Sequence, residues 1–127
     1  MIIEITRAQP KDAKRLAEVF NASFYSDYIK YGECPGYNKT EDSMLSRMKE
    51  YIVYKIIVEN VIAGAISIKK EADNHFYLDA LCVIPDYANK GIGQHAMRFL
   101  DNEFPYAIHW ALETPTDKTQ NHYLFII

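Results

Sequence analysis

Apolar residues recur along the first part of the chain at spacings that separate one strand from two helices. The first six residues, MIIEIT, form a β-branched run typical of a strand. From Pro10 to Phe24 the apolar positions follow one another at steps of three and four, which predicts an amphipathic helix opened by the proline. A second helix is predicted over 41–51, with Thr40 as its N-cap.

Beyond residue 51 the spacing becomes that of strands, interrupted by one helix. Two β-branched runs flank Glu59 and Asn60, and this two-residue gap predicts a hairpin. The predicted strands are 52–58, 61–70, 75–84 and 107–113, and the predicted helices are 91–104 and a last one that starts after Pro115. The order β-α-α-β-β-β-α-β-α predicts one mixed α/β sheet flanked by helices, whose last two strands are parallel and joined through a helix.

Composition and charge exclude several classes of function. The 127 residues are 49% hydrophobic and 24% charged, which fits one globular domain over 1–127. A net charge of -3 provides no basic surface for nucleic acid, and no apolar run approaches the length of a membrane span. The first residues become charged too early for a signal peptide. We therefore expect a cytoplasmic protein that binds neither nucleic acid nor membrane.

Cysteine and histidine are too sparse for a disulfide framework or a metal site. Cys34 and Cys82 are expected to be free thiols in a reducing compartment. The histidines form no His-x-x-x-His pair and have no cysteine at ligand spacing; they are His75, His95, His109 and His122. No metal is expected.

The segment VIPDYANKGIGQHAM, residues 83–97, places glycines where a helix should begin. The first N–H groups of a helix lack partners within it and carry partial positive charge, so an anion bound there is stabilised. Gly91 and Gly93 allow a phosphate to approach closely, and Lys90 adds positive charge. Tight packing of strand against helix would use the same glycines, and the turn alone leaves both interpretations open. The Walker sequence is absent, and GIGQHA fits only a relaxed dinucleotide pattern in the wrong place along the chain.

The run LCVIPDYANKGIG, residues 81–93, resembles the signature of the GCN5-related N-acetyltransferase (GNAT) superfamily, Arg/Gln-x-x-Gly-x-Gly/Ala after a strand ending in Val-x-Pro. Ala88 stands where that signature has Arg or Gln. The resemblance covers nearly the whole chain, with WALETP as the fifth strand, and implies the GNAT fold with a mostly antiparallel sheet. It also implies acetyl-CoA as cosubstrate. The residues implied to bind it are Asn89, Lys90, Gly91, Ile92, Gly93 and Gln94 around the pyrophosphate, and the backbone of Leu81, Cys82 and Val83 along the pantetheine arm, where a bulge splays the fourth and fifth strands.

For the chemistry, the resemblance implies direct transfer of acetyl from acetyl-CoA to a primary amine within a ternary complex. A carboxylate must remove a proton from the amine. Glu113, at the end of the fifth strand, is the first candidate for this base, and Asp79 is the alternative. Phe125 falls where the family has a tyrosine acid, and it has no hydroxyl. The residues expected in the wall of the acceptor site, where rings stack on a cationic amine or simply pack together, are Tyr25, Tyr28 and Tyr31, with Tyr37 beside them.

The resemblance also makes the carboxyl end short. The family continues through the rest of the last helix and two further strands, so this chain is expected to be C-terminally incomplete and to lack those strands. A bare sheet edge favours association, and we expect a homodimer. Three alternatives follow: a truncated family member, an active one completed by a partner chain, or a non-catalytic CoA-binding module. The missing hydroxyl at Phe125 and the short end favour the module.

Overall fold

A computed structural model of the chain describes residues 1–32, 37–72, 75–105 and 109–112. Its elements in chain order are β1 (Ile3–Arg7), the 3-10 turn η1 (Pro10–Asp12), α1 (Ala13–Tyr31), α2 (Glu41–Glu50), β2 (Ile52–Val58), β3 (Val61–Ala72), β4 (His75–Val83), the 3-10 turn η2 (Pro85–Tyr87), α3 (Ile92–Glu103) and β5 (His109–Leu112). This order confirms the predicted mixed α/β architecture. The last predicted helix lies outside the described residues.

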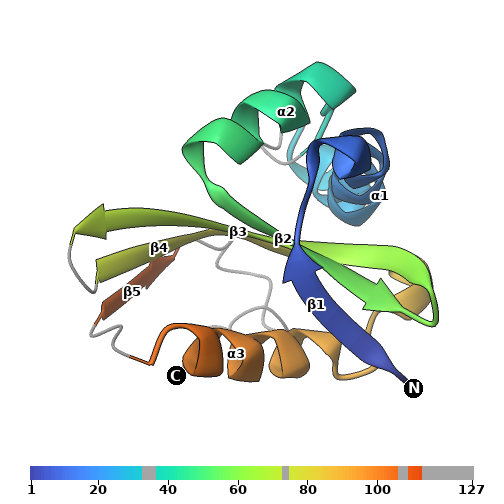
Figure 1. Cartoon of the computed structure of the whole chain (residues 1–127). Helices are drawn as coiled ribbons and strands as arrows, with labels where there is room; N and C mark the ends of the chain where they lie inside the picture. Colours follow the sequence, from blue (N-terminus) through green and yellow to red (C-terminus); the bar gives the residue numbers. More distant parts are fainter. Residues whose placement is uncertain (33–36, 73–74, 106–108, 113–127) are drawn as a thin grey trace.

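The strands form one sheet in the order β1-β2-β3-β4-β5. Neighbours from β1 to β4 are antiparallel, and β5 is parallel to β4, as the strand-helix-strand pattern predicted. Figure 1 shows three layers, with α1 and α2 over one side of the sheet and α3 over the other. These two sides are called the α1 face and the α3 face below.

Each face of the sheet carries a hydrophobic core of its own. On the α3 face, the buried side of α3 packs on alternate residues of the strands; its helical members are Ile92, Ala96, Met97 and Leu100. On the α1 face, buried residues of α1 pack with Met44 of α2 on the sheet; they are Ala13, Leu16, Ala17, Val19 and Phe20. A buried aliphatic side chain of this size contributes roughly 1.5–3 kcal/mol, so the two cores together hold the three layers in place.

The predicted cap of the second helix and the predicted hairpin turn are confirmed. Thr40 caps α2, because its hydroxyl accepts the Ser43 N–H at 3.1 Å while its own N–H donates to the Ser43 hydroxyl at 2.8 Å. Glu59 and Asn60 have φ of 52° and 69°, the left-handed pair that a two-residue hairpin needs. The side chain of Thr40 and the backbone conformation of Glu59 and Asn60 thus determine where these elements start and turn.

The predicted end of the first helix is wrong. We expected it to run from Pro10 to Phe24, whereas α1 starts at Ala13 and continues to Tyr31, where Gly32 ends it with a φ of 78°. The last part of the helix keeps apolar and aromatic residues at helical spacing, but the side chains of Tyr25, Tyr28, Ile29 and Tyr31 are exposed and do not join the buried face on which the prediction rested.

A β-bulge interrupts the pairing of β2 with β3 at Ala63. Ile57 pairs with Ile62 and Ile56 with Gly64, which leaves Ala63 as the extra residue. A bulge takes one residue out of the ladder and changes the face on which the next side chains lie. Ala63 and Ala65 would share a face in a regular strand, but Ala63 packs on the α3 face and Ala65 on the α1 face.

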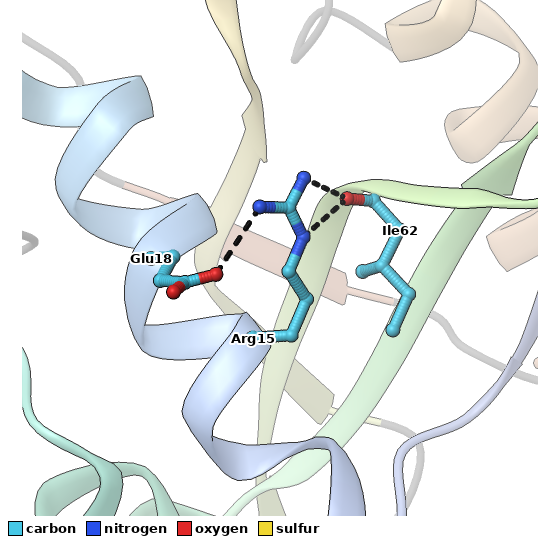
Figure 2. A network of polar contacts seen from close by, with 3 residues as sticks. All are labelled: Arg15, Glu18 and Ile62. Atoms are coloured by element: carbon cyan, nitrogen blue, oxygen red, sulfur yellow. Dashed lines mark hydrogen bonds and ion pairs between the residues drawn. The ribbon is translucent and has the colours of Figure 1, made fainter.

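Arg15 of α1 binds the backbone of β3 next to this first bulge and so connects the helix to the strand (Figure 2). Its Nε and Nη2 atoms donate to the carbonyl oxygen of Ile62 at 3.2 and 2.9 Å, and its Nη1 atom pairs with Glu18 at 3.3 Å. The Glu18 side chain is 58% exposed, so that ion pair adds little to stability. The two charge-assisted hydrogen bonds to the carbonyl are the stronger contact, and they fix α1 relative to β3.

Candidate functional site

A second bulge lies in β4, at Asp79. Ser67 of β3 pairs with Ala80 and Ile68 with Leu78, which leaves Asp79 as the extra residue. Leu78 and Ala80 would share a face in a regular strand, but Leu78 packs on the α3 face and Ala80 on the α1 face. The resemblance implied a bulge in this strand, and the structure has one.

Within the described residues, the pairing of β4 with β5 extends to the residue before this bulge. The register runs from His75 opposite His109 to Leu78 opposite Leu112, the last residue of β5. Residues 80–83, called the distal half of β4 here, pair with β3 and have no β5 partner within the described residues. One edge of this half-strand therefore presents backbone groups away from the ladder it forms with β3.

The residues predicted to line the pantetheine arm all lie in the distal half. Leu81, Cys82 and Val83 pair with residues 64–66 of β3. Leu81 and Val83 pack on the α3 face and Cys82 on the α1 face, so side chains occupy both faces and the backbone alone lines the edge. Their assignment to cosubstrate binding stays a prediction.

Cys82 is placed for packing, not for nucleophilic chemistry. Its side chain is 5% exposed. Burial raises the pKa of its thiol to about 12, although the Ser23 hydroxyl, the Ala65 backbone and the charge of Arg47 act in the opposite direction. The thiolate that a nucleophile requires is therefore almost absent at neutral pH.

Gly64 lets β3 and the distal half of β4 approach closely. A Cβ atom added there would lie 2.5 Å from the carbonyl oxygen of Cys82 and 3.1 Å from the Cδ1 atom of Ile56. Carbonyl and methyl group could not both stay where they are. Sequence reasoning did not single out this glycine, because a glycine inside a strand has many explanations.

Two left-handed residues build the glycine turn between β4 and α3. Asn89 has a φ of 61° and Gly91 a φ of 79°. Asparagine tolerates this conformation better than most residues, and glycine adopts it without steric cost. A Cβ atom at Gly91 would meet nothing within 4 Å, so the conformation and not crowding by the protein requires glycine here.

Helix α3 begins directly after this turn. Ile92 is buried and fixes the first helical turn on the α3-face core. The His95 N–H donates to the Gly91 carbonyl at 3.1 Å. The N–H groups of Ile92, Gly93 and Gln94 precede it and have no partner four residues back within the helix. With the helix dipole behind them, these groups suit an anion such as a phosphate.

Ala88 and Lys90 flank Asn89 in the turn. Ala88 is exposed, its N–H donates to the Pro85 carbonyl at 3.1 Å, and its methyl group offers no donor to a ligand. Lys90 is exposed, and its ammonium lies 5.6 Å from the centroid of the Tyr87 ring, a cation–π contact. Positive charge is therefore held beside the turn although the Arg or Gln of the signature is missing.

Asp79, the alternative base, already has a partner. Its carboxylate accepts a hydrogen bond from the Nη1 atom of Arg47 in α2. Sequence reasoning missed Arg47, which reads as an ordinary polar residue of an amphipathic helix. No spacing along the chain would have paired residues 47 and 79, because only the packing of α2 on the sheet brings them together.

The predicted acceptor tyrosines lie on the last part of α1, after its contact with β4. Tyr25 and Tyr28 both pack against Tyr37, with ring centroids 5.8 and 4.5 Å apart. Tyr31 instead holds the Lys30 ammonium 5.4 Å from its ring centroid. Tyr25 stays 52% exposed, so a cluster of rings is open to solvent at this end of the helix.

Several predicted residues lie outside the described residues: Cys34, Glu113 and Phe125. Within the described ranges, no group of three or more His, Cys, Asp or Glu side chains is arranged to hold a metal ion. None of the helices in those ranges combines the length and apolarity that a bilayer span requires.

Comparison with known proteins identifies relatives over nearly the whole chain. A model of the acetyltransferase (GNAT) family matches residues 13–123. An uncharacterized protein of Bacillus subtilis (strain 168), YrkN, is 25% identical over 126 residues, which are 95% of this chain and 67% of that protein.

Solved structures share the fold at low sequence identity. The PaiA N-acetyltransferase of Thermoplasma acidophilum, in complex with coenzyme A, aligns with a TM-score of 0.82 and 17% identity, over 98% of this chain and 87% of that one. An acetyltransferase of Thermus thermophilus aligns with a TM-score of 0.79 and 15% identity, over 98% of this chain and 84% of that one.

Proposed function

Because the chain belongs to the acetyltransferase (GNAT) family, we propose that it binds acetyl-CoA and transfers the acetyl group directly to a primary amine. One observation carries this proposal. Within the described residues, the distal half of β4 has no β5 partner, and it leads into a left-handed turn after which the first N–H groups of α3 have no partners inside the helix. That the Thermoplasma acidophilum relative is in complex with coenzyme A supports the same ligand here.

The glycine turn would hold the pyrophosphate. The N–H groups of residues 92–94 supply donors, and Lys90 supplies charge. The free space at Gly91 lets a phosphate oxygen approach the backbone. The distal half of β4 would bind the pantetheine arm through backbone N–H and C=O groups, as an added strand would.

A base must then take a proton from the acceptor, since an alkylamine is charged at neutral pH. We propose Glu113 for this role, because the Asp79 carboxylate is already engaged by Arg47. Phe125 offers no proton to the departing thiolate. Since a general acid typically contributes 10²–10⁴-fold, we expect slow turnover.

The acceptor is proposed to be an amine that the exposed tyrosines recognise. Tyr25, Tyr28 and Tyr31 are exposed at the end of α1, and aromatic faces attract ammonium groups by about 0.5–2 kcal/mol each. The same helix contacts β4 through Ser23 and Cys82.

The test has two parts, and both use the whole chain. Calorimetry with coenzyme A should show micromolar binding, and acetyl-CoA with a panel of primary amines should release free thiol. Glu113→Gln should abolish the rise of rate with pH and keep coenzyme A affinity. Glu50→Gln, at the exposed end of α2, is the matched control and should change neither. An unchanged pH–rate profile in Glu113→Gln would remove this residue from the mechanism.

A second candidate function is a non-catalytic CoA-binding module, which the missing hydroxyl at Phe125 favours. Binding of coenzyme A without thiol release over the whole amine panel would select it. Absence of coenzyme A binding at millimolar concentration would contradict both functions. The homodimer expected from the sequence stays a prediction, and light scattering at several concentrations tests it.

A further inference from the structure

Arg47 occupies an enclosed position above the second bulge. Its guanidinium carbon lies 5.4 Å from the centroid of the Phe20 ring and 5.2 Å from that of the Tyr51 ring. Its Nη1 atom donates to the Asp79 carboxylate and to the Ser67 hydroxyl, the latter at 3.3 Å. The Arg47 and Asp79 side chains are 15% and 21% exposed. A planar cation in contact with two rings and with acceptors at its edge has little freedom to turn.

The two acceptors of Arg47 lie on the two strands that meet at the bulge. Asp79 is the extra residue of β4, and Ser67 of β3 pairs with Ala80, the first residue after it. The extra residue of a bulge is outside the ladder, so the ladder does not fix its conformation. Arg47 supplies a contact to the side chain of this residue and another to the facing strand.

The position of this contact along β4 matters more than its strength. The strand pairs with β5 up to Leu78, and the distal half starts two residues later. A shift at Asp79 would therefore be carried into residues 80–83, which have β3 on one edge and no described β5 residue on the other. A misplacement of about 1 Å in a binding groove can cost about 100-fold in rate.

We propose that Arg47 is a positioning residue for the cosubstrate site, which it serves by holding Asp79 and thereby setting the course of the distal half of β4. The inference rests on the proposed function, because it takes residues 80–83 to be the edge that binds acyl-CoA. Asp79 then has a structural role, and Glu113 stays the proposed general base.

Arg47→Met tests the proposal against Arg15→Met. Both substitutions remove an arginine that ties a helix to a β-bulge. Arg47→Met should raise the dissociation constant of coenzyme A at least about 10-fold and lower kcat/KM by about 100-fold. It should also shift the backbone amide resonances of residues 80–83. Arg15→Met should lower the melting temperature and leave coenzyme A affinity within about twofold.

A double variant separates positioning from the cost of a partly buried charge. Arg47→Met alone leaves Asp79 without its cation, whereas Arg47→Met with Asp79→Asn removes both charges. We expect the double variant to regain thermal stability and to keep the weakened coenzyme A binding. If the double variant regains both thermal stability and coenzyme A affinity, the defect of Arg47→Met came from the unpaired Asp79 carboxylate, and the proposal is overturned.

Failure of this inference can be told apart from failure of the proposed function. Unchanged coenzyme A affinity and unshifted resonances of residues 80–83 in Arg47→Met would overturn the inference alone. If the wild-type protein binds no coenzyme A, the proposed function fails, and with it the role in cosubstrate binding. Should Arg47→Met not fold, Arg47→Lys keeps the charge without the planar fork, and the same comparison applies to it.

Discussion

Two of the register shifts in the sheet, the β-bulges at Ala63 and Asp79, lie in neighbouring strands, and each is contacted by an arginine from a helix on the α1 face. At the first, the pairing continues on both sides of Ala63. Its carbonyl accepts the Ile84 N–H at 2.8 Å, and Arg15 binds the adjacent Ile62 carbonyl. The irregularity is thus enclosed by strands and costs the sheet no free edge.

At the second bulge the pairing continues on one side only within the described residues. The last described pair with β5 is Leu78 with Leu112, and Arg47 binds a carboxylate, not a backbone carbonyl. A β-bulge contacted by an arginine therefore has different consequences at the two positions. Enclosed between strands, a bulge redirects side chains; placed beside the last described pair of a neighbouring ladder, it precedes the backbone groups that we propose bind a ligand.

Gly64→Ala joins the two bulges in one experiment and has the largest expected effect. Gly64 follows the first bulge, and an added Cβ would lie 2.5 Å from the Cys82 carbonyl in the distal half of β4. We expect a loss of about 2–3 kcal/mol in the free energy of unfolding, typical of overpacking. Coenzyme A affinity should fall about 10-fold, because the strand that carries Cys82 must move. Chemical denaturation and calorimetry measure the two effects.

Gly32→Ala is the matched control for this substitution. Gly32 ends α1 with a φ of 78°, and an added Cβ there meets nothing within 4 Å. The cost should be about 1–2 kcal/mol of backbone strain, with unchanged coenzyme A affinity. Equal losses of affinity in the two variants would show that the close approach of β3 and β4 has no special part in the site.

Much of the fold could be predicted because local chemistry decided it. Thr40, the Glu59-Asn60 pair and Pro85 mark element boundaries by capping, left-handed backbone and a missing N–H, which are properties of single residues. The glycine turn was found for the same reason. The parallel pair of β4 and β5 followed from the strand-helix-strand order, which allows few topologies.

The contacts around the second bulge could not be predicted. Arg47, Ser67 and Asp79 come from three separate elements and meet only when α2 packs on the sheet. The position of the bulge was also hidden, since LDALCV reads as a continuous apolar strand with one carboxylate in it. Asp79 was therefore considered as a base, and only the packed structure shows the cation that engages it.

Gly91→Ala tests whether the turn after β4 contributes to coenzyme A binding in a way that the hairpin turn before β3 does not. Gly91 and Asn60 both have left-handed backbones, with φ of 79° and 69°. Each substitution to alanine should cost about 1 kcal/mol of stability. Gly91→Ala should also weaken coenzyme A binding about 5-fold, because its turn aims the first N–H groups of α3. Asn60→Ala should leave binding unchanged, and an equal loss of affinity in both would remove the glycine turn from the site.

Cys82 carries the smallest expected effect and tests which part of the distal half a ligand meets. Its thiol is buried on the α1 face, and burial raises its pKa to about 12, so the thiol is almost entirely protonated at pH 8. Iodoacetamide at pH 8 should therefore leave Cys82 unmodified in the native protein and alkylate it in denaturant, as peptide mass spectrometry can show. Cys82→Ala should keep coenzyme A affinity within about twofold, because the proposed contacts are made by the backbone. A 10-fold loss of coenzyme A affinity in Cys82→Ala would contradict this expectation. So would rapid alkylation of native Cys82 that coenzyme A prevents, because either result would place the thiol itself in contact with the ligand. The side chains beyond the bulge would then lie on the opposite faces from those described, and the contrast between the two bulges would no longer account for the site.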